Sequence, residues 1–229
     1  MLITYFEIKQ IPAVLYGEPA NEVWLFLHGK CGCKEEAAAF SEIACAKGYQ
    51  VLSIDLPEHG ARKERDESLD PWLVKPELQE VMQYAKKHWK SVSIRANSIG
   101  AYFSMLSFPD VERALLVSPI LDLERLILDM MSRARVTEAQ LQKQGTLSTE
   151  FGETLSWQYL CYVREHPIHN WRCPIQILYA RQDNMTTYQT VKNFMLHHHV
   201  KLTVMESGEH WFHTPAQLAA LQSWETENI

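Results

Sequence analysis

The sequence lacks the features by which membrane and secreted proteins are most easily recognised. No stretch approaches the roughly 18 consecutive apolar residues that a membrane-spanning helix needs. The first ten residues, MLITYFEIKQ, have no basic start, no long apolar segment and no small-residue cleavage site, so we expect no signal peptide. We therefore expect a cytoplasmic protein without a membrane span.

An excess of positive charge is also absent. The 229 residues include 22 Lys or Arg and 28 Asp or Glu, which gives a formal net charge of −6. Nucleic acids and anionic membranes are usually bound through a basic surface, so the composition argues against both partners. Hydrophobic residues make up 46% of the chain and charged residues 22%, which is typical of a folded globular protein.

The five cysteines lack the pattern of a disulfide framework, because their number is odd and their spacing irregular. Cys31 and Cys33 form the only close pair, and no further ligands follow them at the spacing of a metal site. The histidines at 197–199 follow an expected helix, where a solvated face explains them better than a metal site. We interpret the cysteines as reduced thiols and expect neither a metal nor another cofactor.

Repeats, low-complexity segments and Gly/Ser linkers are absent too, so we expect a single domain over residues 1–229. Short β-branched or aromatic runs alternate with helical patterns, which predicts a mostly parallel sheet of about eight strands flanked by helices. The first two strands are expected to pair antiparallel. The expected strands are 2–8, 13–17, 23–27, 50–55, 91–96, 114–117, 175–179 and 200–204.

Helical patterns fill the intervals between these strands. Helices are expected over 34–47, from Pro76, from near Ile99, and from Thr214-Pro215 at the end of the chain. The segment from about 121 to 171 breaks the alternation, since it reads as three helices without a strand. An all-helical insertion between two strands predicts a cap over the edge of the sheet, and we assign residues 121–171 to it.

Polar side chains follow several expected strands directly, at the edge where ligands bind in open α/β sheets. Ser98, Asp183 and His210 follow three of them, and His28-Gly29-Lys30 follows a fourth. A serine on a sharp turn from strand to helix needs small neighbours two residues away on either side. Ala96 and Gly100 meet that need, although a serine here could instead cap an ordinary helix.

Taken in order, these motifs resemble those of the α/β-hydrolase family over nearly the whole chain. Ala96 replaces the first glycine of the family's G-x-S-x-G nucleophile elbow, and Glu58 replaces the glycine of its D-x-P-G-H-G loop. The motifs are 28–29 (HG), 55–60 (DLPEHG), 96–100 (ANSIG), 179–183 (YARQD) and 208–212 (GEHWF).

The resemblance implies a Ser-His-Asp triad. Ser98 would be the nucleophile, His210 the base that takes its proton, and Asp183 the acid that orients the imidazole. The N–H groups of Ile99 and Lys30 would bind the oxyanion, with Cys31 as the alternative to Lys30.

Several other residues compete for these roles or lie close to them in the sequence. His213 is an alternative base and Asp122 an alternative acid, but both depart from the usual positions in the family. His28 and His59 are expected to order loops. Arg95, in a buried strand, is expected either to pair with a buried acid or to meet an anionic substrate group.

We expect a small or medium ester as substrate and a monomer or homodimer. A thioesterase, a peptidase or amidase, and a C–C hydrolase stay open, because the same triad serves them all. A non-catalytic protein that binds a ligand also stays open. Apolar and polar residues near the expected site are candidates for the substrate pocket, namely His28, Cys31, Asn97, Met130, Met131, Trp157 and Trp211.

Overall fold

A computed structural model describes residues 1–168 and 171–229 and is built on an eight-stranded sheet in the order β1-β2-β4-β3-β5-β6-β9-β10. β2 pairs antiparallel with β1 and β4, and all other neighbours are parallel. The predicted fold class and antiparallel first pair are therefore confirmed. The strands are β1 (Ile3–Ile8), β2 (Ile11–Tyr16), β3 (Glu22–Leu27), β4 (Gln50–Ile54), β5 (Ser91–Asn97), β6 (Ala114–Val117), β9 (Ile175–Ala180) and β10 (Val200–Met205).

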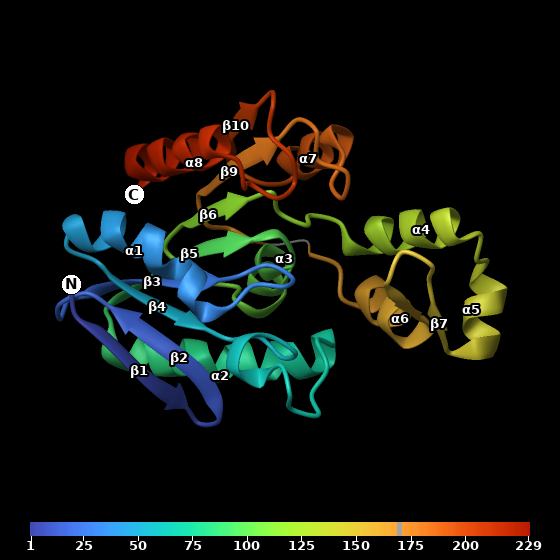
Figure 1. Ribbon diagram of the computed structural model, residues 1–229, viewed down its shortest axis with the longest axis horizontal. Coiled ribbons are helices and arrows are strands. Elements are labelled where there is room, and N and C mark those ends of the chain that lie inside the picture. Colours follow the sequence, from blue (N-terminus) through green and yellow to red (C-terminus); the bar gives the residue numbers. More distant parts are fainter. Residues whose placement is uncertain (169–170) are drawn as a thin grey trace.

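Helices cover both faces of this sheet. Figure 1 shows α1 (Ala37–Ala46) and α8 (Pro215–Asn228) on one side and α2 (Pro71–His88) on the other. α3 (Ser98–Ser107) and α7 (Tyr188–Met195) contribute buried side chains to the same core as α2. Among the described residues, no helix is both long and apolar enough to cross a membrane.

The burial of β3 on both faces of the sheet explains why its sequence is apolar without interruption. Val23, Leu25 and Leu27 belong to the core under α2 and α3, whereas Trp24 and Phe26 belong to the core under α1 and α8. All five side chains are at most 1% exposed. A central parallel strand that is buried on both faces needs apolar residues at every position, and β3 therefore lies at the centre of the sheet.

The second long helix begins earlier than its sequence predicts. α2 starts at Pro71, directly after an extended Asp70, and Pro76 lies inside it. Proline is tolerated at the first helical position, and either proline could mark that position in the sequence. The burial of Val74 explains the earlier start. Val74 is fully buried and lies four residues before Leu78 on the same face, so a helix that begins at Pro71 buries both side chains.

The segment between β6 and β9, which we call the insertion, lies beyond the carboxyl ends of the strands (Figure 1). It is not entirely helical as predicted, because two TLS triplets pair as an antiparallel hairpin. Thr149 and Glu153 close that hairpin through a backbone hydrogen bond. Residues 169 and 170 of the expected cap lie outside the described residues. The insertion consists of α4 (Leu123–Ala134), α5 (Glu138–Gln144), β7 (Thr146–Ser148), β8 (Thr154–Ser156) and α6 (Trp157–Glu165).

α3 approaches β3 so closely that position 100 admits only glycine. A Cβ atom there would lie 2.7 Å from the carbonyl oxygen of Leu27 and would also collide with that of His28. We predict that Gly100→Ala lowers the free energy of unfolding by about 3 kcal/mol, because backbone must move to make room.

Gly145→Ala is the control for the loss of a glycine without a steric clash. Gly145 has a positive φ of 78°, which Gly100 does not share, but no atom lies within 4 Å of the added Cβ. Its cost should be about 1 kcal/mol. Urea unfolding of both variants checks the difference, and equal losses would contradict the steric explanation.

Candidate active site

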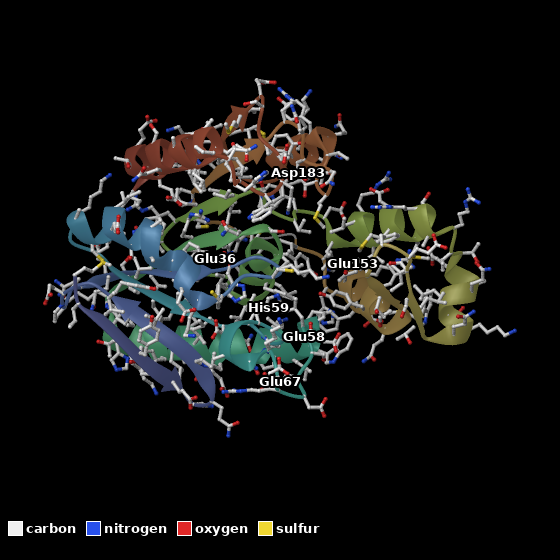
Figure 2. All side chains as sticks on the ribbon, viewed as in Figure 1. Glu36, Glu58, His59, Glu67, Glu153 and Asp183 are labelled. Carbon is white, nitrogen blue, oxygen red and sulfur yellow. The ribbon has the colours of Figure 1, made fainter. Side chains whose placement is uncertain are left out.

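Three predicted residues from three strand ends meet at one edge of the sheet. Ser98 follows β5, Asp183 follows β9 and His210 follows β10. The Ser98 Oγ atom lies 2.8 Å from His210 Nε2, and His210 Nδ1 lies 2.7 Å from Asp183 Oδ2. Figure 2 shows Asp183 on the side of the body that faces the insertion. In the sequence, Asp183 lies 85 positions after Ser98, and His210 lies 27 positions after Asp183. The structure joins all three into one hydrogen-bonded line.

Ser98 occupies a sharp backbone turn. Its φ of 47° lies in the left-handed region, which is costly for a residue with a side chain. Neighbouring backbone holds this conformation, since the Ile120 N–H donates to the Ser98 carbonyl at 3.1 Å. Gly29 approaches from β3, where an added Cβ would lie 3.2 Å from Ser98 Cβ. The small residues around Ser98 thus allow the close approach that the turn requires.

Asp183 fixes the proton position on His210. Its side chain is fully buried, and its Oδ1 atom accepts hydrogen bonds from the N–H groups of Met185 at 2.7 Å and Thr186 at 2.9 Å. The other oxygen, Oδ2, is left to accept from His210 Nδ1. A proton on Nδ1 leaves the Nε2 lone pair facing the Ser98 hydroxyl. Chemically, this arrangement can remove a proton from Ser98.

The loop after β3 lies beside Ser98. Gly32 N–H donates to the Gly29 carbonyl at 3.1 Å, and Cys31 between them is exposed and left-handed, with φ of 65°. Lys30 Nζ donates to Glu153 Oε2 of the hairpin turn at 2.5 Å. This ion pair connects the loop after β3 to the insertion.

The loop of residues 55–60 is fastened to the loop after β3 by a buried carboxylate. Asp55 accepts from the Lys34 backbone N–H and from Lys34 Nζ, both at 2.8 Å, and from Ala61 N–H at 2.9 Å. Burial opposes ionisation, but these donors outweigh it and lower the pKa of Asp55. Glu58, which replaces a glycine in the motif, is left-handed, with φ of 65°.

His28 lies beneath these loops and does not face a substrate. It is fully buried, its Nε2 atom accepts from Leu56 N–H at 3.1 Å, and its Nδ1 atom pairs with the Gly29 carbonyl at 2.7 Å. Both ring nitrogens are therefore engaged, with the proton on Nδ1. Burial lowers the pKa of His28 to about 4, so the ring stays neutral. The expected loop-ordering role fits this environment.

The other predicted pocket residues are dispersed. Asn97 Oδ1 accepts from Arg95 at 2.6 Å, so the side chain is engaged within the body. Met131 is 3% exposed and packs in the core, and Met130 and Trp157 are partly buried against it. Trp211 is 74% exposed and stacks on His213 at 4.9 Å. Their place in a lining around Ser98 stays a prediction.

The competing residues are occupied elsewhere. Asp122 caps α4 by accepting from Arg125 N–H at 2.9 Å. His213 Nδ1 pairs with the Trp211 carbonyl at 2.8 Å, and His59 Nδ1 pairs with the Pro57 carbonyl at 2.6 Å. None of these contacts involves Ser98.

Arg95 pairs with a buried acid, which is one of its two expected roles, and that acid is Glu225. Its Nε atom donates to Glu225 Oε1 at 2.8 Å, and the two side chains are only 2% and 5% exposed. Glu225 follows the buried Trp224 in α8. A buried arginine signals that a partner exists, but 130 residues of sequence separate the two, and nothing in the sequence identifies which acid it is.

Comparison with known proteins found similarity in structure alone, since the sequence matches no family model and no curated protein. Est1E from Butyrivibrio proteoclasticus, solved with ferulic acid bound, superposes with a TM-score of 0.74 at 17% identity, covering 98% of this chain and 96% of that chain. Mouse alpha/beta hydrolase domain-containing protein 10 gives 0.77 at 12% identity, covering 99% and 98%. An esterase from Pyrococcus furiosus gives 0.67 at 14% identity, covering 99% and 87%.

We predict that His28 stays neutral down to about pH 4, because burial penalises the imidazolium. The ring carbon shifts of His28, followed by NMR and assigned with His28→Gln, should titrate near that pH. A midpoint near the ordinary 6.5 would contradict the prediction.

The lowered pKa also ties stability to pH. Between pH 6.5 and about 4, the unfolded chain binds a proton at His28 and the folded chain does not. The stabilisation that neutral His28 contributes to the fold is therefore complete above pH 6.5 and is lost as the pH falls toward 4. The loss should be on the order of 3 kcal/mol. Urea unfolding at both ends of this range measures it, and His28→Gln should remove this part of the dependence.

Proposed function

The chain has the α/β-hydrolase fold, and on that fold we propose that it is a serine hydrolase that cleaves a small or medium carboxylic ester through an acyl-enzyme. The observation that carries the proposal is the unbroken line from Ser98 through His210 to the buried Asp183. This is the arrangement that activates a serine hydroxyl, which is a weak nucleophile by itself.

In the proposed reaction, Ser98 Oγ attacks the ester carbonyl while His210 Nε2 takes its proton. Asp183 stabilises the resulting imidazolium through Nδ1. His210 then gives the proton to the departing alkoxide, which leaves an acyl group on Ser98. A water molecule, activated by the same imidazole, releases the acid and restores the serine.

The oxyanion of both tetrahedral intermediates needs hydrogen-bond donors. We assign this role to the backbone N–H groups of Ile99 and Lys30, with Cys31 as the alternative to Lys30. Ile99 lies in the first turn of α3, where backbone N–H groups have no partner within the helix. Lys30 follows Gly29, which lies against Ser98.

We further propose that the insertion serves as the cap that contributes to substrate binding. Two contacts with the body support this role. Trp72 of α2 packs against Tyr159 and Tyr162 of α6, with ring centroids 6.0 and 5.7 Å apart. Lys30 pairs with Glu153 at the hairpin turn. The insertion is thus held close to the loop that would supply an oxyanion donor.

Replacing the nucleophile tests the central assignment. Ser98→Ala should abolish labelling by a fluorophosphonate and lower kcat for ester hydrolysis by about a million-fold. Asp183→Asn should lower kcat by about ten-thousand-fold, because it favours the wrong imidazole tautomer. Ser107→Ala, at the far end of the same helix, is the control and should label normally. Equal labelling of wild type and Ser98→Ala would refute the assignment.

A series of matched substrates tests which acyl groups the protein accepts. We expect p-nitrophenyl esters of short to medium acyl chains to give the highest kcat/KM, ahead of long-chain esters and of acyl-CoA thioesters. Steady-state rates across a series of graded chain length check this. Higher kcat/KM for thioesters of the same acyl groups would favour a thioesterase instead.

A further inference from the structure

His210 lies within the loop that connects β10 to α8, residues 206–214. Contacts on both sides of His210 hold this loop. On the side of β10, the Gly208 carbonyl accepts from the Gln182 N–H at 2.9 Å. On the side of α8, Phe212 is 7% exposed and packs in the core, whereas Trp211 between them is 74% exposed. The place of the imidazole therefore depends on how the two ends of the loop are fixed.

One buried side chain of α8 reaches both ends of this loop. Gln217 is 3% exposed, and its Oε1 atom accepts from the N–H groups of His213 at 3.0 Å and Thr214 at 3.3 Å. Its Nε2 atom donates to the Ser207 carbonyl at 3.4 Å. Residues 207 and 213 lie three positions before and three positions after His210. A single amide group thus closes the segment that carries the imidazole.

Capping of α8 explains only part of these contacts. α8 begins with a capping box, in which the side chain of the third helical residue, Gln217, reaches back to the N-cap N–H. α5 begins in the same way, with Thr137 and Gln140. Gln140 is exposed, and among the described residues its side chain accepts only from Thr137. A capping box therefore requires neither burial nor contacts on both sides of a distant loop residue.

The far end of α8 is fixed to the strand that leads to Ser98. Glu225 lies eight residues after Gln217, which is about 12 Å along the helix. Its Oε1 atom accepts from Arg95 Nε at 2.8 Å, and both side chains are buried. Arg95 lies in β5, three residues before Ser98. α8 therefore connects the end of β5 to the loop that carries His210.

The proposed proton transfer depends on the separation of these two parts. Ser98 Oγ and His210 Nε2 lie 2.8 Å apart, although they come from different elements. A general base acts only within hydrogen-bond reach of the proton that it takes. A displacement of about 1 Å would cost on the order of a hundred-fold in rate.

We infer that Gln217 is a positioning residue, which closes the segment of residues 207–213 from α8 and so holds the His210 imidazole in line with Ser98 and Asp183. The kinetic consequence of this role rests on the proposed function. The placement of the imidazole is independent of any activity.

Three variants test this role by steady-state kinetics on p-nitrophenyl acetate, well below the Tm of each variant. Gln217→Met, which makes none of the three hydrogen bonds, should lower kcat by about 10- to 100-fold with KM within about twofold. Gln217→Glu should recover most of kcat, because its carboxylate still accepts from the N–H groups of residues 213 and 214. Gln222→Met, at an exposed glutamine of the same helix, is the matched control and should behave as wild type.

Proton NMR of the free protein tests the placement of the imidazole itself. The proton between His210 Nδ1 and Asp183 Oδ2 should give a strongly deshielded signal, which His210→Gln removes and thereby assigns. Gln217→Met should shift or broaden this signal, because the ring loses its fixed distance to Asp183. Gln217→Glu and Gln222→Met should retain it.

The two measurements separate positioning from capping. If Gln217 only capped α8, Gln217→Met would lower Tm and keep the wild-type kcat and the wild-type His210 signal, which would overturn the inference. An unchanged His210 signal would overturn it at any kcat, as would an equal loss of kcat in Gln222→Met. If wild type hydrolyses no ester but Gln217→Met alone disturbs the signal, the proposed function fails and the positioning role stands.

Discussion

The site is built around the transition from β5 to α3, which is made at a single left-handed residue. Ser98 has φ of 47°, and such a conformation persists only where surrounding structure enforces it. β3 supplies much of that enforcement, since Gly29 lies against Ser98 and Gly100 lies against the carbonyls at the end of the strand. The position of the half-buried serine side chain is therefore a consequence of how closely a helix and a strand can approach.

Polar groups beneath the loops hold backbone segments together, which is a different role from the one proposed for Ser98, His210 and Asp183. Neutral His28 joins the segments at 29 and 56 through its two nitrogens, and ionised Asp55 joins those at 34 and 61. Both are fully buried. A buried polar group is costly when unpaired, so each one restricts the loops to arrangements that satisfy it.

Local patterns in the sequence were sufficient for the sheet and for the three residues that the structure joins. The apolar run of β3 follows from its burial, and the small residues around Ser98 follow from the close approach of backbone there. Both patterns are visible in the sequence. The start of α2 at Pro71 depends on the burial of Val74, and the TLS hairpin depends on the pairing of two separate triplets. Glu225 contacts Arg95 from another element, so its place depends on a tertiary contact that no local pattern records.

The insertion leaves the sheet after β6 and returns to β9, and these two strands are neighbours in the sheet. For the sheet, the insertion is therefore a single long connection between two neighbouring strands. The entropy of closing such a connection grows only slowly, by about 0.6 kcal/mol for each doubling of length. Evolution can lengthen, shorten or exchange this segment at little cost to the folding of the sheet, so the insertion is the part of the chain most free to diverge.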